Sequence, residues 1–169
     1  MEEQTKQLEK LSFEDSLTGL FNRNKFNLDM QDFEKILLSR LGVAAIDLNG
    51  LKRVNDRMGH SAGDHLICRA ANHIASMFAG RCYRIGGDEF VVIDSKMEEE
   101  AFRKAVDTTK KNMEQDGISV SVGISWRGGH CNMQEQLDEA DRQMYQAKAA
   151  FYSSLDTDRE KADDGDARC

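Results

Sequence analysis

The stretch Arg84-Ile85-Gly86-Gly87-Asp88-Glu89-Phe90-Val91-Val92-Ile93 decides the fold of this chain. The apolar residues before and after the glycines are typical of two β-strands. Gly86-Gly87 between them predicts a hairpin turn, because glycine takes positive φ without steric cost. Asp88 and Glu89 then begin the outgoing strand at an exposed tip. Two neighbouring carboxylates that both stay ionised need a cation nearby, and the alternative is a turn that is polar only for solubility.

Size and composition indicate one ordinary globular domain. The chain has 169 residues, of which 40% are hydrophobic and 31% charged. No apolar run reaches the roughly 18–20 residues of a membrane span, and the polar start is unlike a signal peptide. The four cysteines show no CxxC spacing. We therefore expect a reduced, cytoplasmic protein with no membrane segment, no zinc site and no disulfide framework.

The formal net charge of −7 arises almost entirely at the two ends of the sequence. Residues 1–15 and residues 156–169 are both rich in acids, and the part between them is close to neutral. A nearly neutral body excludes the basic field that nucleic acid binding needs. A phosphate ligand would have to be met by particular basic side chains and a metal ion.

The hydrophobic periodicity predicts an order of elements that is typical of an α+β protein. The expected helices cover about 4–14, 23–39, 61–78 (with Ser61 as its cap), 97–114 and 133–151, and the expected strands cover 42–48, the two arms of the hairpin and 118–125. Residues 49–58 are expected to form a loop or a short helix. This order favours a ferredoxin-like, palm-type sheet of about five strands with helices packed around it. We expect a helical stalk or linker at 1–14, one domain at 15–152 and an acidic, disordered tail at 153–169.

Three carboxylates are candidates for a metal site. Asp47 lies near the end of the first buried strand, while Asp88 and Glu89 lie at the hairpin tip. If the two segments are neighbours in the sheet, these side chains converge. Oxygen ligands of this kind favour Mg²⁺ or Mn²⁺, which take their remaining ligands from water and substrate phosphates. This arrangement is typical of metal-assisted phosphoryl transfer, although Asp47 alone is equally well explained as a cap for the following segment.

Five motifs, in the right order, resemble one known family. They are Asp15-Ser16-Leu17-Thr18-Gly19-Leu20-Phe21-Asn22-Arg23; Asp47-Leu48-Asn49-Gly50-Leu51-Lys52-Arg53-Val54-Asn55-Asp56 followed by Gly59-His60-Ser61-Ala62-Gly63-Asp64; Gly86-Gly87-Asp88-Glu89-Phe90; Ser121-Val122-Gly123-Ile124; and Ala140-Asp141-Arg142-Gln143-Met144-Tyr145-Gln146-Ala147-Lys148. Over about residues 12–151 the chain is identified as a member of the GGDEF domain, or diguanylate cyclase, family.

The resemblance implies an activity and a set of metal ligands. Members of this family condense two GTP molecules, one per subunit of a homodimer, to cyclic di-GMP with release of pyrophosphate. By resemblance, Asp47, Asp88 and the backbone carbonyl of Leu48 ligate the metals. Glu89 is expected either as a further ligand or as the acceptor of the proton of the attacking 3′-hydroxyl. Asp47, Asp88 and Glu89 are also the expected catalytic residues.

The resemblance also implies substrate-binding residues. Asn55 and Asp64 would read the guanine edge, where a carboxylate accepts from the ring N–H and the amine and so disfavours adenine. Their alternative role is helix capping and solvation. Lys52 and Lys148 would hold the β- and γ-phosphates as point charges. The alternative for Lys148 is a solvated lysine near a helix C-terminus.

The chain departs from the family pattern at two places. Tyr152 stands where the family commonly has a second phosphate-binding base, and the stretch Met77–Gly80 lacks the Arg-x-x-Asp motif through which product inhibits many members. Product inhibition at that stretch is therefore not expected. The departures favour an alternative function, a catalytically weak or inactive GGDEF module that binds GTP and acts in regulation or dimerisation. An upstream sensor domain is a further expected partner.

Overall fold

The computed structural model describes residues 12–166, with side chains for residues 12–155. Its centre is a four-stranded antiparallel sheet in the order β2-β3-β1-β4. The strands are β1 (Arg40–Leu48), β2 (Cys82–Arg84), β3 (Glu89–Asp94) and β4 (Val120–Gly128). The named helices are α2 (Arg23–Glu34), α3 (Leu51–Met58), α4 (His60–Phe78), α5 (Glu99–Gln115) and α6 (Met133–Asp166). The predicted α+β class and element order are confirmed, with four strands in the sheet where about five were expected.

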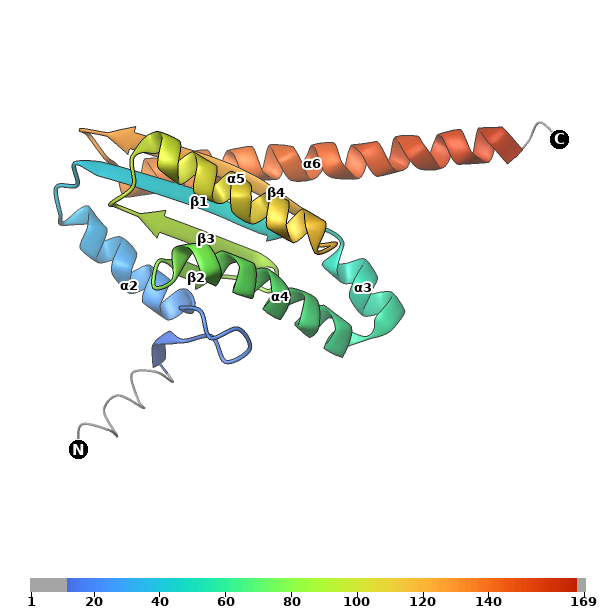
Figure 1. Ribbon diagram of the computed structural model, residues 1–169, viewed down its shortest axis with the longest axis horizontal. Helices are drawn as coiled ribbons and strands as arrows, with labels where there is room; N and C mark the ends of the chain where they lie inside the picture. The colour runs from blue at the N-terminus through green and yellow to red at the C-terminus, as the bar shows by residue number, and fades with distance from the viewer. Residues whose placement is uncertain (1–11, 167–169) are drawn as a thin grey trace.

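Helices cover both faces of the sheet, as Figure 1 shows. Side chains alternate between the faces along a strand. On β1, Val43 and Ala45 pack into the cluster that contains residues of α2 and α6. Ala44 and Ile46 pack into the cluster formed with α4 and α5. By the same alternation Asp47 belongs to the α6 side of the sheet.

Two glycines allow helices to lie close against the sheet. A Cβ added to Gly42 would lie 2.8 Å from the ring of Phe102 on α5. A Cβ added to Gly123 of β4 would lie only 1.9 Å from the backbone oxygen of Ala140 on α6. Because α6 touches β4 with its backbone near Ala140 and Met144, this part of the helix is held close against the sheet.

Some predicted boundaries are wrong. The helix expected over 23–39 ends at Glu34. Ser61 does not cap α4, because the helix begins at His60 after Gly59 and has no side-chain cap. The helix expected to end near 151 continues to Asp166 instead of giving way to an irregular tail at 153. No glycine or proline occurs in α6 before its last two residues to interrupt it.

Of the helix expected over 4–14, residues 12 and 13 are helical, Glu14 forms an isolated β-bridge with Phe21, and residues 4–11 lie outside the described residues. Within the described residues, no helix is both long enough and apolar enough to cross a membrane. The domain limits 15–152 remain a prediction.

Candidate functional site

The ends of β1 and β3 bring the predicted carboxylates together. The register of the two strands places Asp47 directly opposite Glu89. The backbone N–H of Leu48 donates to the backbone carbonyl of Asp88 at 3.0 Å. Side chains opposite one another on adjacent antiparallel strands have Cβ atoms about 4.5–5.5 Å apart. The sheet therefore joins the end of its central strand to the hairpin tip, which is the neighbourhood that the sequence predicted.

The hairpin turn differs from its prediction. Neither Gly86 nor Gly87 has positive φ, and residues 85–88 form a four-residue connection between β2 and β3. Gly86 lies against the Glu89 side chain, because a Cβ there would lie 2.8 Å from Oε2 of Glu89 and the carboxylate would have to shift. The Glu89 side chain thus folds back over the turn.

Lys148 of α6 supplies a cation to this acidic site. Its Nζ lies 2.6 Å from Oδ1 of Asp47 and 3.9 Å from Oδ2 of Asp88. Burial raises the pKa of Asp47, and the charges of Asp88 and Glu89 act in the same direction, whereas Lys148 opposes them. Burial works against the charged form of Lys148, but its contacts with Asp47 outweigh burial and raise the pKa of the ammonium. The carboxylates and the lysine thus form one electrostatic unit.

A fourth acid approaches from α6. Asp141 is half-buried, and its pKa is raised by burial and by the charges of Glu89 and Asp138. Asp141 belongs to the last of the five motifs, but the sequence alone indicated no role for it. The carboxylate of Asp141 is close enough to interact with that of Glu89, and it adds to the negative charge that a cation would neutralise.

The donor set fits a hard divalent metal ion. Asp47 is 1% exposed, and its Oδ1 has no well-aligned hydrogen-bond donor among the described residues although the ammonium lies close to it. A buried carboxylate of this kind, facing a second carboxylate across a cation, is suited to Mg²⁺ or Mn²⁺. In the described residues no three acidic, histidine or cysteine side chains already surround a common point. The ligand roles of Asp47, Leu48, Asp88 and Glu89 all stay predictions.

The predicted guanine-reading residues lie at the contact between α3 and α4. The Oδ1 atom of Asn55 is buried and lacks a hydrogen-bond partner within the described part of the chain. It rests against Gly63, where an added Cβ would lie 1.9 Å from it. Asp64 follows Gly63 and is exposed. A buried amide oxygen without a hydrogen bond lowers the stability of the fold. The Oδ1 atom of Asn55 is therefore an acceptor that a donor of a bound ligand could satisfy.

A cavity of about 520 Å³ opens beside the N-terminus of α3. Its lining includes Gly50, Lys52, Phe151 and Tyr152. The hydroxyl of Tyr152 accepts a hydrogen bond from the backbone N–H of Gly50 at 3.2 Å. The sequence indicated only that Tyr152 replaces a phosphate-binding base, and it did not predict this contact. The position of Tyr152 one helical turn beyond Lys148 was the signal that could have placed it near the site.

Asn49 has a structural role at the same end of the sheet. Its amide nitrogen donates to the hydroxyl of Ser119 at 3.0 Å, and its amide oxygen accepts from the hydroxyl of Ser121 at 2.9 Å. These bonds tie the loop after β1 to the start of β4. The side-chain oxygen of Asn49 is therefore already hydrogen-bonded within the protein.

The turn at residues 15–22 braces the hairpin. Asp15 accepts hydrogen bonds from the backbone and hydroxyl of Thr18 and forms an ion pair with Arg84 at 3.0 Å. The same guanidinium donates to the carbonyl of Gly87 at 2.9 Å. Arg23 donates to the carbonyl of Ile85 at 2.6 Å. The approach to the hairpin tip is therefore fixed by a segment distant in sequence.

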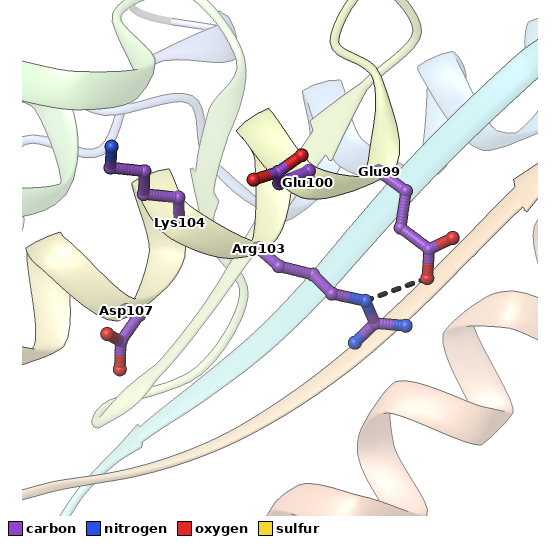
Figure 2. A pocket seen from close by; sticks show the side chains of 5 residues that line it. All are labelled: Glu99, Glu100, Arg103, Lys104 and Asp107. Atoms are coloured by element: carbon purple, nitrogen blue, oxygen red, sulfur yellow. Dashed lines mark hydrogen bonds and ion pairs between the residues drawn. The ribbon is translucent and has the colours of Figure 1, made fainter.

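A second hollow lies on α5 and is of a different kind. Figure 2 shows the side chains of this one helix around it, among which Arg103 pairs with Glu99 at 2.8 Å. The lining residues are Glu99, Glu100, Arg103, Lys104 and Asp107. Charges of both signs, spaced one turn apart on an exposed helix, are typical of a solvated face, and we assign no site there.

Comparison with known proteins identifies the class of protein. The family model described as "Diguanylate cyclase, GGDEF domain" matches residues 12–153. The chain belongs to the GGDEF family. It is 30% identical over 146 residues to diguanylate cyclase DgcS of Shewanella oneidensis, an alignment that covers 80% of this chain and 49% of that protein. It is also 34% identical over 158 residues to cyclic di-GMP phosphodiesterase NbdA of Pseudomonas aeruginosa, covering 84% of this chain and 20% of that protein.

Solved structures agree on the fold. The coiled coil and GGDEF domain of DgcB from Caulobacter crescentus, determined in complex with c-di-GMP, superposes with a TM-score of 0.77 at 22% identity. That match covers 88% of this chain and 87% of the other. The chain spans about half or less of the length of the two curated relatives named above.

Proposed function

We propose that this protein is a diguanylate cyclase, which condenses two GTP molecules to cyclic di-GMP with release of two pyrophosphates. The observation that carries the proposal is the position of Asp47 opposite Glu89, with Asp88 bound to Leu48 through the backbone. Family membership supports the same activity. Since relatives named as phosphodiesterases also contain such a domain, the activity of this chain needs its own test.

The proposed reaction has two equivalent steps. In each, the 3′-hydroxyl oxygen of one GTP forms a bond to the α-phosphorus of the other, and the bond from that phosphorus to the pyrophosphate oxygen breaks. Glu89 receives the hydroxyl proton. Asp47 and Asp88, with the Leu48 carbonyl, would hold Mg²⁺ or Mn²⁺, which supplies electrostatic stabilisation of the charge on the phosphates.

Other residues of the chain bind the nucleotide. Asn55 and Asp64 accept from the guanine edge, which selects GTP over ATP because adenine would leave the acceptors unpaired. Lys52 and Lys148 attract the β- and γ-phosphates. Tyr152 contributes no positive charge near them, so we expect weaker GTP binding than a second base would give.

Turnover needs two copies of the chain. Each site holds one GTP, and in-line attack on the α-phosphorus requires the two sites to face each other about a two-fold axis. Specific activity should therefore rise with protein concentration until the dimer is saturated. Such a protein would act in cytoplasmic signalling, downstream of a sensor domain.

Product identification tests the proposal. The purified chain is incubated with GTP and MgCl₂ over a range of protein concentrations, and products are identified by mass. We expect cyclic di-GMP and pyrophosphate from the unaltered chain and neither from Glu89→Gln. Glu100→Gln, on the exposed face of α5, is the matched control and should retain full activity. A Glu89→Gln variant with normal turnover would remove this residue from the mechanism.

A second candidate function is favoured by Tyr152. Its hydroxyl already holds the N–H of Gly50, at the mouth of the cavity where the resemblance would put a phosphate-binding base. A GGDEF module that binds GTP for regulation or dimerisation would tolerate this replacement. Equilibrium binding of GTP without product formation at any protein concentration would select this function over the first.

A further inference from the structure

The ammonium group of Lys148 already lies where a metal ion would be bound. It contacts one oxygen of Asp47 at 2.6 Å and lies 3.9 Å from an oxygen of Asp88. The Asp47 side chain is almost fully buried, and that of Lys148 is 26% exposed. Lys148 is therefore a partly buried counter-ion shared by two carboxylates rather than a freely solvated lysine.

An ammonium and a divalent cation cannot both occupy this position. Both would need to approach the same oxygen of Asp47, and like charges at such separations repel strongly where water is partly excluded. The unit formed by Asp47, Asp88 and Lys148 thus has two alternative arrangements. One contains the lysine, and the other contains the metal with the lysine displaced.

The surroundings offer a place for the displaced ammonium. Lys148 lies one turn before Tyr152 on α6, and Tyr152 lines the cavity beside the N-terminus of α3. A lysine side chain has a flexible four-carbon stem, so a change of rotamer can turn the ammonium toward an anion at the cavity mouth.

We propose that Lys148 competes with the metal ion for Asp47 and Asp88, so that the metal binds poorly alone and well together with a nucleotide whose phosphates attract the displaced ammonium. The nucleotide part of this inference rests on the proposed function. The competition itself rests only on the two carboxylates and the lysine. In thermodynamic terms, metal and nucleotide bind with positive coupling, and each raises the affinity for the other by the same factor.

Binding of Mn²⁺ alone tests the competition. Free Mn²⁺ is followed by electron paramagnetic resonance during titration of the nucleotide-free chain, Lys148→Met and Lys148→Gln. We expect both variants to bind Mn²⁺ at least about 10-fold more tightly than the unaltered chain, because removing the ammonium leaves the carboxylates without a cation. Asp47→Asn should abolish the gain when combined with Lys148→Met. Equal or weaker Mn²⁺ binding by both lysine variants would overturn the proposal.

Two further measurements make the result decisive. If a lysine variant is too unstable for titration, the rise in its melting temperature with Mn²⁺ is compared with that of the unaltered chain, and a smaller rise contradicts the proposal. In the presence of GTP, the Mn²⁺ affinity of the unaltered chain should increase more than that of Lys148→Met, and an equal increase contradicts the coupling. Neither readout requires product formation, so absence of cyclase activity would count against the proposed function alone.

Discussion

Replacing Arg84 by Met should destabilise the fold and loosen the hairpin tip. The guanidinium pairs with both carboxylate oxygens of Asp15, at 3.0 and 3.1 Å, and donates to the Gly87 carbonyl at 2.9 Å. The side chains of Arg84 and Asp15 are 14% and 21% exposed. Hydrogen bonds to charged groups contribute about 1.5–3 kcal/mol when buried. Because this pair is partly exposed, we expect a loss of about 2 kcal/mol.

The loss should depend on pH. Burial works to raise the pKa of Asp15, but the hydrogen bonds from Thr18 and Arg84 outweigh burial, and the pKa lies below its ordinary value of 3.8. A carboxyl group with a lowered folded-state pKa stabilises the protein above its unfolded-state pKa. That contribution disappears as pH falls through the folded-state value. The effect of Arg84→Met should therefore be complete at neutral pH and shrink below about pH 4.

Urea denaturation measures the free energy of unfolding at each pH. A loss of about 2 kcal/mol lowers the midpoint by about 1 M urea if the slope is near 2 kcal/mol/M. Arg103→Met is a matched control, because its ion pair with Glu99 is about half exposed and should contribute less than about 1 kcal/mol. The reasoning is refuted if Arg84→Met and Arg103→Met lose equal stability, or if the Arg84→Met effect is unchanged between pH 7 and pH 3.

Three further substitutions and one control test the site and the packing of α6 beside it. Gly86→Ala should reduce cyclic di-GMP formation at least about 10-fold with little change in melting temperature, because the added Cβ displaces the Glu89 carboxylate. Gly123→Ala should lower stability by about 3 kcal/mol or more in thermal unfolding, because its Cβ meets the backbone of α6. Tyr152→Arg should lower the KM for GTP about 3–10-fold by adding a phosphate-binding charge, while Tyr152→Phe should not.

The sequence predicted the fold best where the pattern of apolar residues was strong. The apolar run of β1 indicated a buried strand, and the structure explains the run by helices on both faces of the sheet. Asp47, as the single acid in that run, was identifiable as exceptional from the sequence alone. Its place opposite Glu89 depended on strand order, which only the resemblance made accessible.

Local conformation and distant contacts were predicted less well. The glycines of the turn suggested positive φ, but neither has it, and Gly86 instead lies close against the Glu89 side chain. The bond between Tyr152 and Gly50 joins residues 102 positions apart. No periodicity reports such a contact, because it depends on the angle at which α6 leaves the sheet. The lysine between two carboxylates was missed for the same reason.

Asp47 lies on β1, an inner strand of the sheet, and this makes its part of the site the most rigid. The strands β3 and β4 pair with β1 on its two sides along its length. Deuterium should therefore enter the amide of Asp47 only when the whole domain unfolds. The hairpin tip, which is held by side chains of residues 15–23, and the turns of α6 beyond Lys148 are not paired on both sides in this way. Any adjustment that accommodates substrate or closes two subunits together must then come from those two elements, around an anchor that stays still.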